Sequence, residues 1–493
     1  MRNQRPSSTP SGAGPVKARA RIDKAIDAHR ALKPLQSRAL LQRLLFALMT
    51  YCAIDFGTSN SAIAIPSADG QPGMRLVPLE GEHLTMPTAV FYCTDADDLP
   101  TGVHRFHSSG AQIELPRTFG RAAVKAYIDG YEGRLMRSMK SILGTAMVDQ
   151  TTEVGNGQGV KYIDIITGYL RHLRDQAQTT SGVDLDRVVM GRPVFFVDDD
   201  AERDAQAQAS LEEAARAVGF QEVAFQYEPI AAAFDHEQRA TGEELVLVAD
   251  IGGGTSDFSV VRVGPQRAPR TDRRDDILAS HGVHIAGTDF DRRVSLSAIM
   301  PTLGYGAFGP SVQGQPPRPV PSRVYFDLTT WHLINTVYQP QRVAELKAML
   351  DFYGEVVHHQ RLMKVVMERL GHALIGQAEH AKIAVADGGQ FDIDLQMIER
   401  GLHQAFDEQQ AAKALQDDLG RIVQCAHETV QLAGLRTDDI DALYFTGGST
   451  GLKLLTDQLE AAFPKARAER GDRLASVATG LGLHAARLFK GKA

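Results

Sequence analysis

Short apolar stretches, each closed by Gly-rich or polar residues, recur along the chain and have the composition of buried strands. Tyr51 to Asp55 (YCAID) and Leu245 to Asp250 (LVLVAD) both end in an aspartate and lead into a Gly-rich turn. A second apolar stretch follows each turn, Ala62 to Ile65 in the first case and Phe258 to Val263 in the second. This order predicts two β-hairpins with a carboxylate at the mouth of each. A further strand, Ala442 to Phe445 (ALYF), leads into a third Gly-rich turn that opens a helix.

Helical patterns occupy much of the remaining chain. Asp198 to Val218 predicts a helix with acidic residues at its N-terminus, and Val343 to Ala386 is mostly helical. Gly264 to Asp276 and Pro310 to Pro321 are expected to be exposed connections. An apolar stripe at helical spacing predicts the core face of a helix that Gly434 ends. It comprises Leu415, Leu419, Ile422, Val423, Ala426, Val430 and Ala433.

Charge and cysteine content narrow the class of protein. The 493 residues carry 53 Lys and Arg against 60 Asp and Glu, a net charge of −7. Residues 1–48 contribute +8, which leaves −15 for the rest and argues against a nucleic-acid binder. Cys52, Cys93 and Cys425 lack CxxC spacing, so we expect neither a disulfide framework nor a zinc site, and a reducing, cytoplasmic location. Leu40 to Met49 is too short and polar to cross a membrane, so we expect no membrane partner.

The basic N-terminal segment has three interpretations. Residues 1–18 are rich in Ser, Pro and Gly, and Arg19 to Leu48 can form a basic amphipathic helix. The segment resembles a targeting peptide, and it could equally be an arm that binds an acidic surface. We favour a misassigned start, with translation beginning at Met49, because the first motif-bearing strand follows at once.

The residues at the three Gly-rich turns predict phosphate loops. Glycines let the backbone approach an anion, consecutive N–H groups cradle it, and Thr or Ser hydroxyls add donors. At the third turn a helix N-terminus adds its dipole. The predicted contacts are Gly57, Thr58, Ser59 and Asn60 in the first turn, Gly252, Gly253, Gly254 and Thr255 in the second, and Gly447, Gly448 and Ser449 in the third.

The aspartates beside the first two turns predict a metal ion. Asp55 and Asp250 would repel a phosphate unless a cation lay between them, so they indicate Mg²⁺, held through water. The two loops lie 195 residues apart and share one pattern, which favours a related pair over two chance turns. Neither G-x-x-x-x-G-K-[ST] nor G-x-G-x-x-G after a strand occurs, which excludes P-loop and Rossmann sites.

In this order the three motifs resemble the actin/hexokinase/heat-shock ATPase superfamily. In detail they resemble the nucleotide-binding domain of DnaK-type proteins of the heat-shock-protein-70 family, and most closely the truncated YegD-like branch. The likeness covers about residues 50 to 490. It is also carried by Arg187 to Phe196 with Pro193, Tyr227 to Ala233 (YEPIAAA), Met139 to Gly144 (MKSILG) and Ala286 to Asp291 (AGTDFD).

The resemblance implies an α/β, actin-like ATPase fold. Two lobes, each built on a ribonuclease-H-like mixed sheet with flanking helices, would hold the nucleotide in a central cleft. We expect a basic extension over residues 1–48, lobe I over 49–245, lobe II over 246–450, and C-terminal helices over 451–493 that close the nucleotide domain. Because the likeness runs almost to residue 493, we expect no peptide-binding domain and exclude peptide binding through an attached clamp.

The resemblance also implies Mg²⁺-dependent ATP hydrolysis, with ATP or ADP bound in the cleft. Lys140 would neutralise charge on the γ-phosphate, while Glu228 and Asp250 would polarise the attacking water and Thr255 would hold a phosphate oxygen. Gly287, Glu379 and Lys382 would bind the nucleotide.

Four residues depart from the family pattern. Ile383 and Ala386 follow Lys382 where the family has Arg and Ser, and Gly451 stands where the family offers an arginine to adenine. Two guanidinium planes that stack on the base are thus missing, so we expect weaker adenine binding or altered base selectivity. Asn60 replaces an aromatic residue of the first loop, and its short polar side chain still permits a phosphate contact.

The favoured function is that of a slow ATPase of the heat-shock-70 chaperone family, whose nucleotide state controls binding to a protein client or co-chaperone. Alternatives are a small-molecule kinase on the same fold and a nucleotide-gated module that does not hydrolyse ATP. An actin-like filament former has no specific support.

Overall fold

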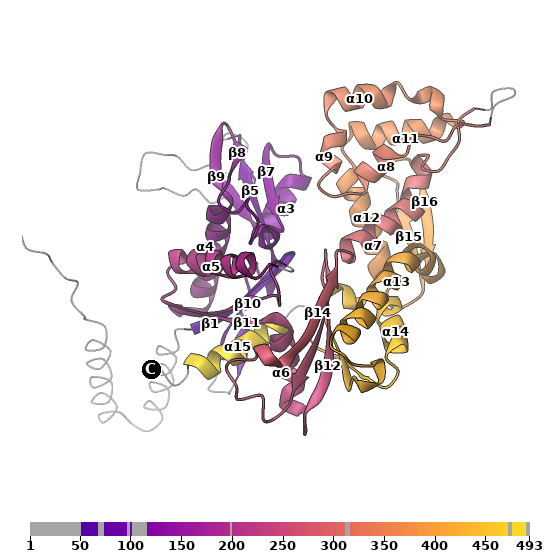
Figure 1. Cartoon of the computed structure of the whole chain (residues 1–493). Coiled ribbons are helices and arrows are strands. Elements are labelled where there is room, and N and C mark those ends of the chain that lie inside the picture. The colour runs from indigo at the N-terminus through magenta and orange to yellow at the C-terminus, as the bar shows by residue number, and fades with distance from the viewer. Residues whose placement is uncertain are drawn as a thin grey trace, which may run out of the picture.

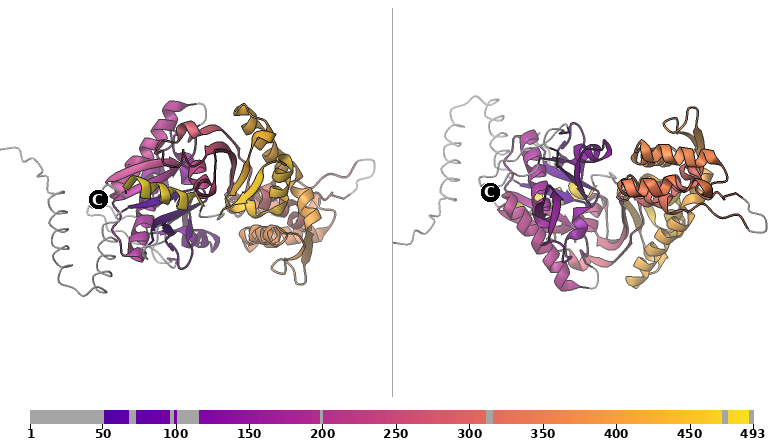
Figure 2. Two further views of the ribbon diagram at one scale, coloured as in Figure 1. Left: turned by 90° about the horizontal axis from the view of Figure 1, so that it is seen from below. Right: turned by 90° about the horizontal axis from the view of Figure 1, so that it is seen from above.

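The computed structural model describes residues 51–67, 73–95, 99–100, 116–197, 200–310, 316–471 and 476–489. These residues form two lobes that stand side by side and meet at their base (Figure 1). Figure 2 shows the same pair of lobes from below and from above. The basic extension, its helix and the start at Met49 lie outside the described residues.

The first lobe is built on a mixed sheet around the first predicted hairpin. Strands β1 (Tyr51–Phe56), β2 (Asn60–Pro66) and β3 (Met74–Leu76) pair antiparallel, and β4 (Thr85–Pro87) also pairs with β2. On its other side β1 runs parallel to β10 (Arg187–Arg192), which runs parallel to β11 (Glu222–Tyr227).

The second lobe repeats this topology around the second hairpin. Strands β12 (Glu244–Ile251), β13 (Ser256–Val263) and β14 (Ile277–Val283) pair antiparallel, and β12 runs parallel to β17 (Ala442–Thr446) and β17 to β18 (Arg467–Arg470). Each sheet is therefore an antiparallel three-stranded half joined to a parallel half through the strand that carries the aspartate.

The central strands are buried on both faces, which explains their nearly continuous apolar sequence. Cys52, Ile54 and Phe56 of β1 face the core beside α4 (Tyr162–Ser181) and α5 (Ala201–Val218). Tyr51 and Ala53 face a second core that also includes Val246 and Val248 of β12. This second core is shared by the two lobes and joins them at the base.

Two helices fill that shared core. Helix α6 (Glu228–Arg239) follows β11, and helix α15 (Ser476–Phe489) follows β18, so the two occupy equivalent places in the two repeats. They pack against each other, with α15 on β1 and β10 and α6 on β12 and β13. Gly480 makes the close crossing possible, because a Cβ there would lie 1.9 Å from the Ala231 carbonyl oxygen.

Insertions enlarge each lobe on the side away from this base (Figure 1). In the first lobe they are β5 (Ala89–Cys93), β6 (Arg117–Phe119), α3 (Gly120–Ile128), β7 (Gly133–Arg137), η1 (Met139–Ile142), β8 (Thr151–Gly155) and β9 (Gln158–Lys161). In the second lobe they are α7 (Gly287–Val294), η3 (Ser295–Ile299), η4 (Met300–Leu303), α8 (Arg323–Leu328), α9 (Ile334–Val337), α10 (Pro340–Lys347), η5 (Leu350–Phe352), α11 (Val356–Met367), α12 (Gly371–Ala384), β15 (Gln390–Asp394) and β16 (His403–Asp407).

The remaining elements complete the second lobe and change the predicted boundaries. They are η2 (Arg274–Asp276), α13 (Glu408–Leu432), η6 (Thr437–Asp439), η7 (Gly448–Gly451) and α14 (Lys453–Ala462). The second lobe continues past the predicted end at 450, because α14 and β18 belong to it. The C-terminal segment also includes a strand, and only its last helix, α15, crosses to the first sheet.

The loop from Gly264 to Asp276, expected to be exposed, contains a buried ion-pair cluster instead. Arg273 is 1% exposed, and its guanidinium lies 2.8 Å from the Glu237 carboxylate of α6 while also contacting Asp276. The prediction was wrong for this part of the loop because two buried carboxylates compensate the desolvation of the guanidinium.

Candidate active site

A cleft of about 1000 Å³ lies between the two lobes. All the residues predicted to bind or act on a nucleotide line it, from both lobes and from seven separate parts of the chain. They are Asp55, Gly57, Thr58, Ser59, Asn60, Lys140, Glu228, Asp250, Gly252, Gly253, Gly254, Thr255, Gly287, Glu379, Lys382, Gly447, Gly448 and Ser449. The structure thus brings the predicted residues together, and their individual roles stay predictions.

The first loop is the tight turn between β1 and β2. Gly57 is required there, because a Cβ would lie 2.2 Å from the Asn60 carbonyl oxygen. From the neighbouring segment, Thr88 donates its hydroxyl to the Gly57 carbonyl oxygen at 2.7 Å and its N–H to the Ser59 carbonyl oxygen at 2.9 Å. These bonds fix the loop from its carbonyl side.

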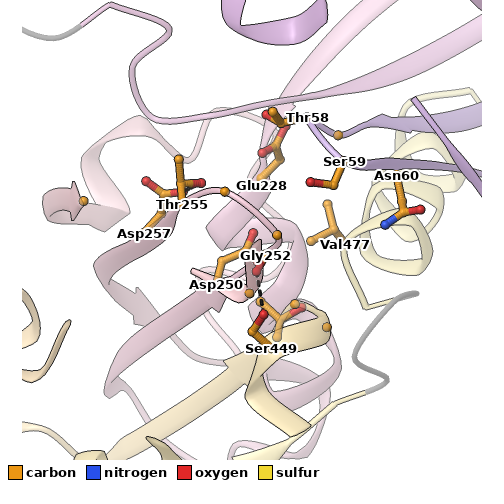
Figure 3. A pocket seen from close by; sticks show the side chains of 18 of the residues that line it. Thr58, Ser59, Asn60, Glu228, Asp250, Gly252, Thr255, Asp257, Ser449 and Val477 are labelled. Carbon is orange, nitrogen blue, oxygen red and sulfur yellow. Dashed lines mark hydrogen bonds between the residues drawn. The ribbon is translucent and has the colours of Figure 1, made fainter. Parts of the chain in front are cut away.

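The second loop, between β12 and β13, is held in the same way. The Gly252 carbonyl oxygen accepts from the Ser449 hydroxyl at 2.6 Å and from the Gly287 N–H at 3.3 Å, as the dashed line of Figure 3 shows for Ser449. The Gly253 carbonyl oxygen accepts from the Thr288 N–H at 2.8 Å. These bonds occupy the carbonyl oxygens of the loop.

The backbone donors of the two loops remain available. Within the described part of the chain, no acceptor takes the N–H groups of Thr58 and Ser59, or those of Gly253 and Gly254. The loops also face each other, since a Cβ on Gly253 would lie 2.7 Å from the Ser59 hydroxyl oxygen (Figure 3). Paired free N–H groups on opposite walls are a suitable site for a polyphosphate.

The third loop is placed by sheet register. Strand β17 pairs with β12 so that Thr446 lies beside Asp250. Gly447 follows with φ 86°, and a Cβ there would lie 2.4 Å from the Ile251 carbonyl oxygen, so glycine is required. The predicted helix near Leu452 begins at Lys453, after the 3₁₀ turn η7.

A lysine and several carboxylates meet between the first two loops. Lys140 is 8% exposed, and its Nζ lies 2.5 Å from Glu228 Oε1. Burial raises the pKa of Asp55 to about 7, with Glu228 adding to the shift and Lys140 opposing it. Burial also raises the pKa of Asp250 to about 8, with the charges of Asp257, Glu228 and Asp55 adding to it.

The single lysine does not balance these acids. Burial alone would lower the pKa of Lys140, but the charges of Glu228 and Asp55 keep it above its ordinary value. The oxygen-rich, negatively charged pocket suits a hard divalent cation. Among the described residues, no group of three or more His, Cys, Asp or Glu side chains could hold a metal ion by itself. A cation there would need water or phosphate oxygens to complete its ligand shell.

The far end of the cleft is formed by α12 and the third loop. Lys382 Nζ lies 2.7 Å from Asp291 Oδ1 and 3.5 Å from the Gly287 carbonyl oxygen, so this lysine is fixed from α7. Burial raises the pKa of Asp291 to about 6, although the charge of Lys382 opposes the shift. Ile383 also lines the cleft and is 60% exposed.

Two carboxylates of the site had no predicted role. Asp257 accepts the Thr255 hydroxyl at 2.7 Å, and Asp291 pairs with Lys382. Both lie in or beside motifs described above, Asp257 two residues after Thr255 of the second turn and Asp291 at the end of AGTDFD. Their position in those motifs was therefore the signal that could have identified them.

Comparison with known proteins identifies the family to which the chain belongs. Residues 51–296 match the model of the Hsp70 protein family, a segment that includes both phosphate loops, Lys140 and Glu228. The chain belongs to the Hsp70 family. Hsp70 proteins have an actin-like ATPase fold, and the mixed α/β architecture found here agrees with it, so the predicted fold class is confirmed.

Curated relatives carry chaperone names. A chaperone protein HscA homolog of Pseudomonas paraeruginosa is 30% identical over 255 residues, which are 49% of this chain and 36% of that protein. The stromal 70 kDa heat shock-related protein of Pisum sativum chloroplasts is 29% identical over 247 residues, 49% of this chain and 32% of the relative. A chaperone protein dnaK of Gracilaria tenuistipitata var. liui is 28% identical over 247 residues, which are 49% of this chain and 36% of that protein.

The chain thus spans about a third of the length of the curated Hsp70 relatives it matches. The family match ends at residue 296, so α12 and the third loop lie beyond it. Membership of the YegD-like branch stays a prediction. None of the helices in the described ranges has the length and apolar character that a membrane span requires.

Proposed function

We propose that this Hsp70-family protein binds ATP with Mg²⁺ in the cleft, hydrolyses it slowly, and uses its nucleotide state to control binding to a protein client or co-chaperone. The observation that carries this proposal is the pair of phosphate loops. They occupy equivalent turns of two equivalent sheets and face each other across one cleft, with Lys140 and Glu228 between them.

The chemistry follows from the positions of the side chains. The free N–H groups of the two loops would bind the phosphates from both lobes, and Thr58 and Thr255 would add hydroxyl donors. Lys140, kept protonated by its acidic neighbours, would stabilise negative charge on the terminal phosphate. Glu228, bound to Lys140, would orient the attacking water.

Asp55 and Asp250 are the residues that would hold Mg²⁺, through water. The ion would neutralise phosphate charge in the cleft. It would also offset the burial, and the charge of Glu228, that raise the pKa of both carboxyl groups.

Control of a partner rests on the two-lobed architecture. A ligand that contacts both walls of the cleft favours the closed arrangement of the lobes, and a partner that recognises that arrangement then depends on the nucleotide. The chaperone names of the relatives support a protein partner of this kind. We also propose a cytoplasmic location, because Cys52, Cys93 and Cys425 are unpaired and buried, which suits a reducing compartment.

The second candidate is a module that binds nucleotide without hydrolysing it. The Lys140–Glu228 pair favours it, because at 2.5 Å each charge already has an ionic partner, which weakens the action of Lys140 on a phosphate and of Glu228 on a water. Measurement of ATP turnover distinguishes the slow ATPase from the module that only binds nucleotide.

The test combines calorimetric titration of Mg-ATP and Mg-ADP with measurement of ATP turnover. For Lys140→Ala we expect nucleotide binding within a few-fold of wild type and turnover lowered by about a hundredfold or more. Lys125→Ala is the matched control, since Lys125 is an exposed lysine of α3 whose ionic partner, within the described ranges, is Asp129. Wild-type protein that binds no nucleotide would sink the proposal, and binding without turnover would establish the second candidate.

A further inference from the structure

One cation of the cleft has no assigned role. Of the residues that the structure describes, three lysine and arginine side chains line the cleft, and two of them are paired, Lys140 with Glu228 and Lys382 with Asp291. The third, Arg137, makes no hydrogen bond or ion pair with any residue in the described ranges. An arginine carries five N–H donors, and a guanidinium in a cleft with none of them used is available to a ligand.

Arg137 is held in place by an aromatic ring of the opposite lobe. It is the last residue of β7, in the first lobe, and its Cζ lies 4.6 Å from the ring centroid of Trp331, in the second lobe between α8 and α9. The Tyr127 ring of α3 stacks on the same indole, with centroids 4.9 Å apart and an interplanar angle of 16°. Figure 1 shows β7 and α3 on the side of the first lobe that faces α9 and α12.

The charges around Arg137 show which end of the cleft it serves. Burial lowers the pKa of Arg137, and the charge of Glu379, on α12, opposes that shift. Lys140, only three residues later, is instead influenced by Glu228, Asp55 and Asp250. The two cations therefore divide the cleft, with Lys140 at the phosphate loops and Arg137 at the α12 end.

We propose that Arg137 is a nucleoside-binding residue, whose guanidinium plane contacts the base and ribose of a purine nucleotide while the Trp331 ring holds it across the cleft. This inference rests on the proposed function, because it assumes that the phosphates occupy the two loops. At the α12 end the other wall is formed by Ile383, Ala386 and Gly451, which offer no planar cation. Arg137 supplies one from the opposite lobe, where a guanidinium can stack on a base.

The test measures binding of Mg-ADP and of magnesium tripolyphosphate, which lacks the nucleoside, by calorimetry. For Arg137→Ala we expect affinity for Mg-ADP to fall about tenfold, as loss of a stacked cation predicts, and affinity for tripolyphosphate to stay unchanged. Arg137→Lys keeps the charge and loses the plane, so it should weaken Mg-ADP binding nearly as much. Arg134→Ala is the matched control, because Arg134 lies on the same strand, outside the cleft, and donates to the Glu153 carbonyl oxygen.

The outcomes separate this inference from the proposed function. Wild-type binding of Mg-ADP with an unchanged Arg137→Ala variant overturns the role of Arg137 alone, whereas absence of wild-type binding overturns both proposals. Full recovery in Arg137→Lys, or an equal loss for tripolyphosphate, would assign Arg137 to the phosphates and contradict the inference.

Trp331 gives a second readout as a positioning residue. It is the only tryptophan of the chain, so its fluorescence reports on this contact without labelling. We expect its emission to change when wild type binds Mg-ADP and to change much less in Arg137→Ala. Trp331→Phe keeps an aromatic face and should bind Mg-ADP within about twofold of wild type, while Trp331→Ala should lose about as much affinity as Arg137→Ala. Equal affinity of both Trp331 variants would contradict the positioning role.

Discussion

At the scale of single residues, the cleft concentrates acids that are costly to ionise together. Asp250 shows this most clearly, since burial and then Asp257, Glu228 and Asp55 raise its pKa from 3.8 to about 8. At a pH between 3.8 and about 8, Asp250 is protonated in the folded protein, whereas the same carboxyl group is ionised in the unfolded chain. The free energy of unfolding therefore decreases as pH rises through this window.

The first prediction follows from that sign. Asp250→Asn removes the titrating group, so without nucleotide and in the presence of EDTA its melting temperature should exceed that of wild type near pH 8 and should differ little near pH 4. Each kcal/mol relieved corresponds to about 1 °C for a chain of this size. Melting curves across pH measure this, with the exposed Asp457→Asn as control. A wild-type melting temperature that rises steadily from pH 5 to pH 8 in step with the variant would refute it.

Residues whose partners are distant in sequence were the hardest to predict. Lys140, Glu228 and both aspartates of the loops were predicted to share one site, and they line one cleft, because each lies in a short motif that the family resemblance or the Gly-rich turns made recognisable. The burial of Arg273 could not, since its partner Glu237 is 36 residues away on α6. Arg137 was missed for the same reason, because its position depends on Trp331 of the other lobe.

At the scale of elements, α6 and α15 cross with their backbones close together in the shared core. A Cβ on Gly480 would lie 1.9 Å from the Ala231 carbonyl oxygen and 2.6 Å from its carbonyl carbon, and backbone atoms cannot rotate away as a side chain can. Separation of the two helices would loosen the core that both sheets share.

The second prediction is that Gly480→Ala destabilises the protein by about 1 to 3 kcal/mol, the usual cost of overpacking, despite alanine's higher helix propensity. Gly420→Ala on α13 is the matched control, because a Cβ there meets nothing within 4 Å. It should be neutral or stabilising by up to about 1 kcal/mol. Denaturant unfolding measures both changes, and equal stability of the two variants would disprove the packing argument.

The strands around the motifs and the two hairpins were predicted correctly, but the pairing between strands that are distant in the sequence was not. β1, β2, β12, β13 and β17 follow from apolar runs between Gly-rich turns, and the structure confirms each within two residues. The place of β18 beside β17 was missed, because Arg467 to Arg470 is polar and its strand character arises only from parallel pairing.

At the scale of the whole molecule, the nucleotide would bridge two bodies that share a core only at their base. The cleft is lined by loops of both lobes, so a ligand bound there adds contacts between parts that are otherwise joined through the base and through the contacts of Trp331 with Arg137 and Tyr127. Ligand binding should therefore stabilise the lobes together.

The third prediction concerns this linkage. Mg-ADP at a hundred times its Kd should raise the free energy of unfolding by about 2.7 kcal/mol. Calorimetric melting should then show both lobes unfolding in one transition, at a higher temperature than without ligand. Magnesium chloride with adenosine alone serves as control, because it lacks the phosphates that bind the two loops. A melting temperature unaffected by Mg-ADP would contradict the bridging role.

The equivalence of α6 and α15 has a consequence for how the chain is divided. Each of these helices ends one repeat and covers the sheet of the other, α6 on β12 and β13, α15 on β1 and β10. The two halves are therefore related like subunits of a domain-swapped dimer fused into one chain. A cut after Arg239 would leave the first half without the helix that covers its sheet, so the halves should become soluble only when they are produced together.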